Sequence, residues 1–382
     1  MTSPLLSGIK SHFEEVRDPR QYGKIDHPLL NIIFITICGV LCGADDWVAI
    51  AAFAQAQQTW LAKYLDLENG IPSHDTLGRT FAMINGQEFQ QGFLNWMSSV
   101  SQLIEGVVAV DGKQLRRSHD KGIGKEAIHM VSAWGVANGL VLGQRKVDEK
   151  SNEITAIPQL LKALDLKGCI VTIDAMGCQT EIAQQIVDQE GDYVLSLKGN
   201  QGQLHEDVVE MFDYFEEIAF QDIDHDYHKT VNKGHGRLEI RECWVFEPAA
   251  WSDYFRTLDK WAGLHSVAMI RTQRQEDEKV TTETRYFITS LAPQAEKILF
   301  AARNHWAIEN GLHWVLDIAF NEDQSRVRQG YAAENLAVIR HLVLNLLSQE
   351  KSLKVGKKNK RLRCAWDVDY REKVLSGFAA LC

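Results

Sequence analysis

The sequence lacks the features of several protein classes. Its seven cysteines are an odd number and no two form Cys-x-x-Cys, so we expect neither a disulfide framework nor a cysteine-based zinc site. The most apolar run, Leu29 to Gly43, is short for a membrane span and carries Asn31 and Thr36, so it predicts a buried core helix. No signal-peptide pattern opens the chain. Together these absences predict a cytoplasmic protein with no membrane partner.

An excess of positive charge and several common catalytic motifs are also missing. The formal net charge is −10, which argues against a protein that coats nucleic acid through overall basicity, although DNA contact can be confined to patches. The chain has no Walker-type phosphate loop, no His-Glu-x-x-His and no nucleophile elbow. A metal site built from carboxylates remains open, because such a site is itself acidic.

Hydrophobic periodicity divides the chain into regions of different character. Residues 1–100 predict a helical N-terminal domain, in which Ser73 can cap a helix that begins near His74. A turn followed by a capped helix is typical of DNA-reading helix-turn-helix units, but many helical bundles contain one. At the other end, residues 349–382 predict a basic C-terminal tail, because positions 351 to 363 hold seven basic residues and no acidic one.

Residues 101–348 predict one α/β domain, with a mostly β insertion at about 199–293. The order of elements before the insertion is three strands, a helix, a strand, a helix and a strand. Helical crossovers make the later strands parallel to a neighbour, and this is the strand order of an RNase H-like mixed sheet flanked by helices. The expected strands are Val107–Val110, Ile128–Trp134, Leu140–Val147, Cys169–Ile173 and Tyr193–Leu197; the expected helices are Ile154–Leu166 and Thr180–Gln189.

Two aspartates come at the ends of strands that should be neighbours in this sheet. Asp111 and Asp174 each follow an apolar strand and precede a small residue. Two carboxylates at the same height repel each other unless a cation lies between them. Mg²⁺ is the expected cation because it prefers carboxylate oxygens and water, with Mn²⁺ as an alternative. The plainer alternative is that each aspartate caps a strand end or turn.

A third carboxylate is expected, since two metal ions that act on one phosphodiester need more than two acidic ligands. Glu309 lies on a Trp-rich helix after the core, where it shares one face with His313 and Asp317. A solvated face with a salt bridge is the other interpretation of this spacing. Glu239 competes for the role, but it stands between Arg237 and Arg241 on one strand face. Those cations compete with a metal for its oxygens, so we predict Glu309.

Basic side chains in two places are candidates for DNA contact. The strand around Glu239 turns a polar face to one side, which indicates either a phosphate track or an exposed face of paired charges. The basic tail indicates sequence-independent affinity for phosphate, the alternative being a solvated helix end. The candidates are His235, Arg237 and Arg241 on the strand, and Lys357, Lys358, Lys360 and Arg361 in the tail.

From about Phe13 to Phe378 the chain resembles the H-repeat-associated proteins, a family of bacterial insertion-sequence transposases with a DDE active site. The motifs that carry this resemblance are Asp18-Pro19-Arg20, Glu68-Asn69-Gly70-Ile71-Pro72, Ala109-Val110-Asp111-Gly112-Lys113, the run from Asp148 to Pro158, Asp174-Ala175-Met176-Gly177-Cys178-Gln179, Lys198-Gly199-Asn200-Gln201, and the run from Arg303 to Asn310. Together they are highly specific, whereas any one alone would be weak.

The resemblance implies an RNase H-like catalytic domain whose triad is Asp111, Asp174 and Glu309. It also implies that the substrate is double-stranded DNA, both the terminal repeats of the protein's own element and the target, and that the protein multimerises to join two ends. The best-studied related transposases have Tyr, Arg and Lys around the glutamate, where this chain has Ala302, His305 and Leu316. Phosphate contact is therefore expected from other residues, with Lys198, Arg303 and His305 as candidates.

Two other functions stay open at this point. One is a catalytically idle DNA-binding protein left by a decayed mobile element. The other is a stand-alone metal nuclease that acts on other nucleic acids. Retention of all three carboxylates argues against loss of the active site, and strand transfer on element ends would separate the transposase from both alternatives.

Overall fold

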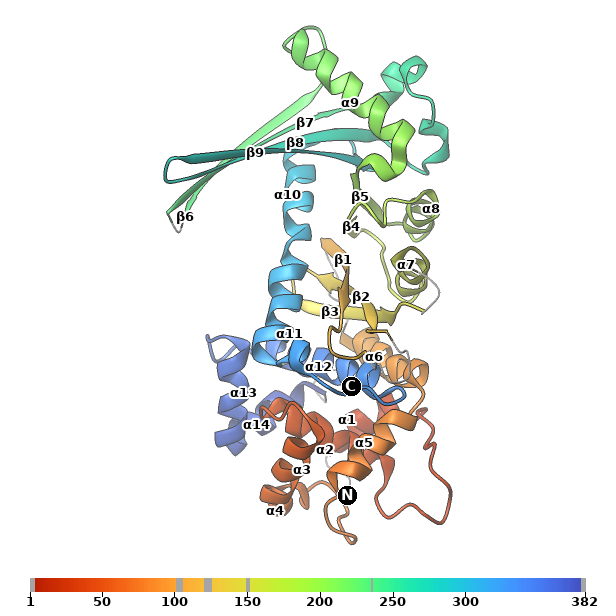
Figure 1. The fold of residues 1–382 in the computed structure, drawn as a ribbon, viewed down its shortest axis with the longest axis vertical. Helices are drawn as coiled ribbons and strands as arrows, with labels where there is room; N and C mark the ends of the chain where they lie inside the picture. The colour runs from red at the N-terminus through yellow and green to blue at the C-terminus, as the bar shows by residue number, and fades with distance from the viewer. Residues whose placement is uncertain (1–3, 101–105, 120–125, 149–151, 235, 379–382) are drawn as a thin grey trace.

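The computed structural model describes residues 4–100, 106–119, 126–148, 152–234 and 236–378. The molecule is elongated (Figure 1), with a helical region at one end, a mixed sheet in the middle and long strands at the other end. The candidate His235 lies outside the described residues. No helix in the described ranges is long and apolar enough to span a membrane.

The N-terminal region is helical, as its periodicity predicts. The apolar run forms a helix that is buried along nearly its whole length, because other helices surround it. Ser73 caps the helix that begins at His74 by accepting a hydrogen bond from the Thr76 backbone N–H, which confirms that cap. The helices are α1 (Pro4–Phe13), α2 (Leu29–Leu41), α3 (Trp47–Ala56), α4 (Gln58–Leu61), α5 (His74–Met83) and α6 (Gly86–Val100).

The central sheet has the predicted order of elements. The elements are β1 (Val107–Gln114), β2 (His129–Gly135), β3 (Leu140–Lys146), α7 (Glu153–Leu161), β4 (Ile170–Ile173), α8 (Thr180–Asp188) and β5 (Asp192–Leu197). Strand β4 pairs in parallel with β1 and β5 pairs in parallel with β4, whereas β1, β2 and β3 are antiparallel. This is an RNase H-like sheet, and the first and fourth strands are neighbours as expected. One detail differs: β1 continues three residues beyond Asp111, because β2 pairs with it as far as Gln114.

The segment expected as a β insertion extends the same sheet. Its last strand pairs with β5, so the nine strands follow the order β3-β2-β1-β4-β5-β9-β8-β7-β6. Within the insertion the sequence predicts strands over Arg237–Phe246, Ser266–Thr272 and Thr284–Ser290, which correspond to β7, β8 and β9. It predicts neither β6 nor the long helix before it. The elements are η1 (Gly199–Gln201), α9 (Gly202–Glu217), β6 (Asp226–Gly234), β7 (Arg237–Phe246), η2 (Pro248–Tyr254), η3 (Leu258–Lys260), β8 (Ser266–Glu276) and β9 (Lys279–Thr289).

A long helical path then returns along the sheet to the helical end of the molecule (Figure 1). Helical periodicity predicts one helix from Ala295 to about Phe320. The structure has three helical pieces there, of which the middle one is a π-helical turn. These are α10 (Ala295–His305), η4 (Glu309–His313) and α11 (Trp314–Ala319); η5 (Glu322–Gln324) and the buried helix α12 (Ala332–Gln349) follow. Helix α10 contacts β1, which brings the next turn of the chain to the strand that carries Asp111.

The basic tail is not a free tail. It forms α13 (Lys357–Trp366), α14 (Val368–Leu375) and η6 (Ser376–Phe378), of which α13 packs on α2, α11 and α12. Lys360 is buried and donates to the Leu347 backbone carbonyl, and Arg361 is buried and donates to the Val40 carbonyl. Their assignment to DNA contact is therefore wrong, because both cations are used inside the protein. Lys357 is half-buried and donates to the Ser348 hydroxyl, and Lys358 is exposed.

Candidate active site

Three carboxylates from distant segments line one pocket of about 290 Å³. Asp111 comes from β1, Asp174 follows β4, and Glu309 is the first residue of η4. In the parallel pair β1–β4, Val110 is the partner of Ile173, so the next residue on each strand is an aspartate. The sequence prediction that Asp111 and Asp174 lie side by side at one height is consistent with this register.

Gly112 leaves room for two neighbouring side chains beside Asp111. A Cβ at Gly112 would collide with the Glu153 carboxylate and would lie 2.6 Å from His129 Nε2. Those two side chains form an ion pair of 2.6 Å directly against the strand. The Asp-Gly-Lys sequence therefore lets a half-buried acid–histidine pair lie beside the first aspartate.

Asp111 carries a charge that the protein does not balance. Burial raises the pKa of Asp111 to about 7, with the carboxylates of Asp174, Glu153 and Glu309 adding to the rise and the Gly112 backbone N–H opposing it. Asp111 makes no ion pair with Lys or Arg in the described part of the chain. A carboxylate in this position stays ionised at neutral pH more easily when an external cation is bound.

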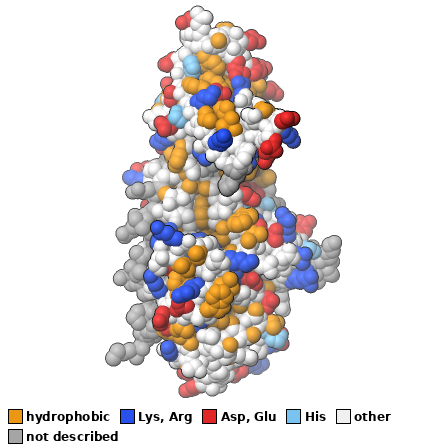
Figure 2. All heavy atoms as spheres, turned by 90° about the vertical axis from the view of Figure 1, so that its left-hand side faces the viewer, with side chains coloured by type: hydrophobic (Ala, Val, Ile, Leu, Met, Phe, Trp, Pro, Cys, Tyr) orange, Lys and Arg blue, Asp and Glu red, His pale blue; other side chains and the backbone are white. Residues whose placement is uncertain are grey.

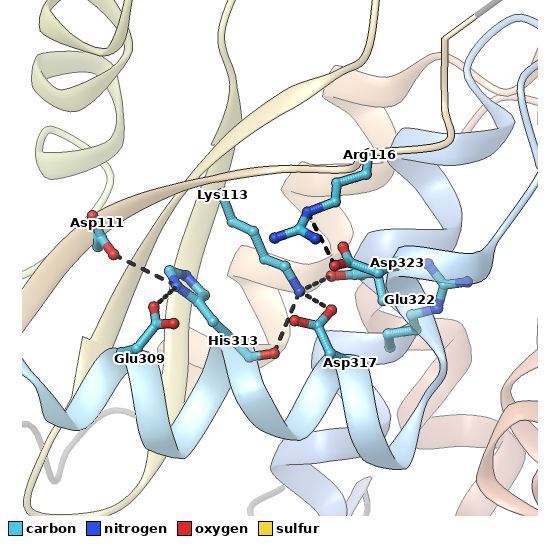
Figure 3. Close-up of polar contacts among 9 residues, drawn as sticks. Asp111, Lys113, Arg116, Glu309, His313, Asp317, Glu322 and Asp323 are labelled. Atoms are coloured by element: carbon cyan, nitrogen blue, oxygen red, sulfur yellow. Dashed lines mark hydrogen bonds and ion pairs between the residues drawn. The ribbon is translucent and has the colours of Figure 1, made fainter.

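Glu309 and His313 meet Asp111 from the helical side (Figure 3). His313 Nδ1 lies 3.0 Å from Glu309 Oε2 and 3.5 Å from Asp111 Oδ2, and its side chain is 6% exposed. Burial lowers the pKa of His313, although the Glu309 carboxylate opposes this, and the lower pKa favours the neutral ring. One ligand atom from each of Asp111, Glu309 and His313 lies within 4.8 Å of the others.

Asp174 lines the pocket but stays outside this compact group. Its Oδ1 accepts hydrogen bonds from the backbone N–H groups of Met176 at 3.0 Å and Gly177 at 3.3 Å. The turn-capping function considered for this residue is therefore present, alongside its position at the pocket wall. Within the described residues, Asp111, Glu309 and His313 are the only group of three His, Cys, Asp or Glu with metal-ligand spacing.

The donor set fits a divalent cation. Two carboxylates supply hard, negatively charged oxygens, and a neutral imidazole supplies a nitrogen without adding charge. The half-buried pocket has room for a phosphate beside them, since it is also lined by Lys198, Arg285, His305 and Trp306. Asp111, Glu309 and His313 are thus the residues best placed to hold a metal ion, with Asp174 at its edge.

Lys113 fixes the helix against the strand next to this group. It stands two residues after Asp111, so both side chains leave β1 on the same side. Its Nζ donates to the His313 backbone carbonyl at 3.3 Å, to the Asp317 carboxylate, and to Glu322 Oε2 at 3.1 Å. The His313 carbonyl belongs to the π-turn, so this contact helps to set the turn that carries Glu309 (Figure 3).

Gly311 allows the same turn to lie close to the sheet. A Cβ at Gly311 would lie 2.7 Å from the Trp134 ring on β2. A side chain there would require either the turn or the Trp134 ring to shift.

An arginine-rich groove of about 400 Å³ adjoins the carboxylate pocket. The two share Arg285, Phe287, Ala302 and Trp306 in their walls. The charged residues that line the groove are Arg237, Arg241, Arg274, Arg285 and Arg303, with Glu239 and Glu283. On the face in Figure 2, Lys and Arg side chains are spread across the middle of the molecule. The groove carries net positive charge and leads to the acidic pocket.

Glu239 is held by arginines rather than by the site. Its carboxylate lies 2.5 Å from Arg241 and 2.9 Å from Arg274. Although partial burial opposes it, these guanidinium groups lower the pKa of Glu239. This agrees with the expectation that Glu239 pairs with arginine, and that Glu309 approaches Asp111 instead.

The remaining candidates fall around the pocket and the groove. Lys198 is exposed at the pocket, and His305 lies there half-buried with Nδ1 3.2 Å from the Thr172 hydroxyl. Arg237 and Arg303 are exposed in the groove, whereas Arg241 is half-buried and tied to Glu239. Sequence reasoning gave no function to His313 or Lys113. The signal for His313 was its position four residues after Glu309, and that for Lys113 was its place two residues after Asp111.

Two family models match the chain. Residues 103–346 match the model described as "Transposase DDE domain", and residues 10–97 match the model described as "DDE_Tnp_1-associated". The first spans more than half of the chain and contains Asp111, Asp174 and Glu309.

Curated relatives match nearly the whole length. "Putative transposase YncI" of Escherichia coli O157:H7 is 42% identical over 380 residues, which cover 98% of this chain and 96% of the relative. "H repeat-associated putative transposase YhhI" of Escherichia coli (strain K12) is 42% identical over 381 residues, covering 97% and 98%. Among solved structures, piggyBac transposase in a synaptic complex with hairpin DNA aligns with 99% of this chain and 81% of that chain, at a TM-score of 0.46 and 9% identity.

Proposed function

Since the chain belongs to the family of transposases with a DDE domain, we propose that it cuts the DNA ends of its own insertion element and joins them to target DNA. The proposed catalytic carboxylates are Asp111, Asp174 and Glu309. One observation carries this proposal: the three line a single pocket, and within the described residues none forms an ion pair with Lys or Arg. Carboxylates gathered without a protein cation repel one another, and a bound external cation relieves that repulsion.

Mg²⁺ is the proposed cofactor, with Mn²⁺ as an alternative. Asp111 and Glu309 would hold the ion, and Asp174 would contribute from the end of β4. When bound, such a cation would neutralise the charge that develops on the phosphate and would lower the pKa of a bound water.

The other residues around the pocket are proposed to hold DNA. Lys198 and His305 lie where the scissile phosphate would enter, and Arg237, Arg241 and Arg303 would bind the backbone on either side. Phosphate contacts of this kind position a duplex without reading its sequence. They replace the Tyr, Arg and Lys of better-known relatives, two of whose positions are the apolar Ala302 and Leu316.

The proposed reaction has two phosphoryl transfers and no covalent enzyme intermediate. Water attacks a phosphodiester at the element end, and the bond to the departing hydroxyl oxygen breaks. A hydroxyl freed at the element end then attacks a phosphodiester of the target, so a new P–O bond forms as an old one breaks. Because two element ends must be joined together, the active complex is proposed to be a homo-oligomer on double-stranded DNA, in the cytoplasm.

Retention of the acidic residues favours an active enzyme over an idle remnant. All three carboxylates, Asp111, Asp174 and Glu309, are present, which argues against decay by loss of the active site.

The test is cleavage and joining of the DNA that flanks the gene. Purified protein with Mg²⁺ should nick and join duplexes that carry the inverted repeats, and chelation or Asp111→Asn should stop both steps without loss of the thermal unfolding transition. A scrambled duplex serves as control. Equal cutting of the scrambled duplex would indicate a nuclease, and binding without cutting would indicate an idle remnant.

A further inference from the structure

His313 closes the carboxylate pocket on the side of the helix. Its Nδ1 faces both carboxylates, at 3.0 Å from Glu309 Oε2 and 3.5 Å from Asp111 Oδ2. The ring is almost fully buried, so it is not simply a surface histidine that happens to lie near acids. It is the only nitrogen donor in the metal-spaced group of the described residues.

We propose that His313 is a direct nitrogen ligand of the divalent cation held by Asp111 and Glu309, so that the site has a mixed oxygen and nitrogen donor set. This inference rests on the proposed function for the presence of the cation. It adds a ligand that the three-carboxylate assignment does not contain.

The backbone around His313 is fixed in a way that suits a ligand. Its carbonyl accepts from Lys113 Nζ at 3.3 Å, and its neighbour Leu312 is buried. Gly311 packs against Trp134, which holds the turn against β2. A ring on such a support keeps its position when a cation enters, and a fixed ligand binds more tightly than one that must be ordered.

A hydrogen bond alone is the competing interpretation. In it, His313 Nδ1–H donates to Glu309 and only orients that carboxylate. Within the described residues, however, His313 Nε2 is buried and has no hydrogen-bond partner, so no acceptor fixes which nitrogen carries the proton. With the proton on Nε2, the Nδ1 lone pair faces Asp111 and Glu309, which is the form that binds a metal ion. The buried Nε2–H then has no acceptor among the described residues, so the bond to the metal must outweigh that cost.

A nitrogen ligand has a chemical consequence for metal choice. Carboxylate oxygens suit both Mg²⁺ and Mn²⁺, whereas imidazole suits the first-row transition metals, so a nitrogen ligand shifts the preference of the site away from Mg²⁺. Wild-type protein should therefore bind Mn²⁺ more tightly than Mg²⁺. His313→Asn places an amide near the position of Nδ1 and should reduce that preference several-fold.

The direct test is electron spin echo spectroscopy of Mn²⁺ bound to the full-length protein. Wild-type protein should show ¹⁴N modulation from a nitrogen ligand. Selective ¹⁵N labelling of histidine should change this modulation, which would identify the nitrogen as one of histidine without any substitution. His313→Asn should lose the signal while still binding Mn²⁺. His305→Asn is the matched control, because His305 lines the same pocket but bonds to Thr172, and it should keep the signal.

Each result decides between the two proposals. Bound Mn²⁺ without a histidine nitrogen signal would refute the ligand and leave the transposase proposal standing. A signal that survives in His313→Asn, or disappears in His305→Asn, would also refute it. If wild-type protein bound no Mn²⁺ at all, both the ligand and the metal-dependent function would be wrong.

Discussion

Asp111 and Lys113 leave the same strand on the same side and meet the same helical path, yet their surroundings are opposite (Figure 3). Asp111 faces Glu309 and a neutral histidine, with no protein cation to balance it. Lys113 faces the carboxylates of Asp317 and Glu322, and Arg340 lies 3.4 Å from the far side of Glu322. The negative charge around Asp111 is therefore not compensated by a protein cation, whereas the carboxylates around Lys113 are compensated by Lys113 and Arg340.

The difference separates the two kinds of buried charge. Although burial opposes it, Lys113 and Arg340 lower the pKa of Glu322, whereas burial and like charges raise the pKa of Asp111 to about 7. A compensated network stabilises one arrangement of strand and helix. An uncompensated acid lowers stability until a cation binds, and such perturbed groups cluster at functional sites. Glu239 and Glu309 repeat the contrast, one paired with arginines and the other not.

The largest effect is expected from removing the charge of Glu309. Glu309→Gln should reduce Mg²⁺-dependent cleavage by about a thousandfold, because a metal ligand supplies several kcal/mol to the transition state. Glu239→Gln is the matched control and should retain most cleavage. A nicking assay in which Glu239→Gln is inactive and Glu309→Gln is active would show that Glu239, rather than Glu309, is the third carboxylate of the site.

Breaking the compensated network should destabilise the fold. Lys113→Met leaves Asp317 and Glu322 without their shared cation, and should lower the free energy of unfolding by about 3–5 kcal/mol in denaturant titrations. Adding Asp317→Asn to Lys113→Met should restore part of the loss, since within the described residues Asp317 pairs with no other cation, whereas Glu322 keeps Arg340. An unfolding free energy that does not change in Lys113→Met would mean that the network does not hold the helix.

Asp111→Asn should act in the opposite direction on the metal-free protein. The folded-state pKa of Asp111 is raised from 3.8 to about 7, so ionisation destabilises the fold and wild-type stability should fall as pH rises through this window. The variant should be more stable than wild type at pH 8, by a few kcal/mol at most, and equal to it near pH 4. Mg²⁺ should raise the melting temperature of wild type only. A variant less stable than wild type at pH 8 would contradict an uncompensated charge.

The smallest effect concerns the two basic regions. Replacing Arg237 and Arg303 in the groove by alanine should reduce the slope of log affinity against log salt by about 2, at ~0.9 for each phosphate that is no longer neutralised. Replacing Lys354 and Lys358 near α13 should reduce it less, because Lys360 and Arg361 are withdrawn from the surface. Deletion of the whole C-terminal segment is not a usable test, since α13 and α14 pack on the core. An equal decrease of the salt slope in both variants would show that the groove contacts no more DNA phosphates than the region of α13.

Local sequence patterns were sufficient for much of the fold. Strand and helix periodicities, with the rule that helical crossovers join parallel strands, predicted the order of β1 to β5 and the β1–β4 pairing. The adjacency of Asp111 and Asp174 follows from that pairing. Ser73 as a cap and α2 as a buried helix also follow from residues close in sequence.

Tertiary structure alone decided what depends on distant partners. Helix α9 and strand β6 were missed, and nothing local shows that β9 pairs with β5 rather than forming a separate sheet. The run from 351 to 363 is basic in composition, but Arg361 is buried because the Val40 carbonyl and Asp45, more than 300 positions earlier, accept its hydrogen bonds. In the same way His313 gains its position only where the π-turn, Lys113 and Gly311 bring it to Asp111. A sequence determines which residues carry charge, whereas the free energy of burying a charge depends on partners that only the folded chain brings together.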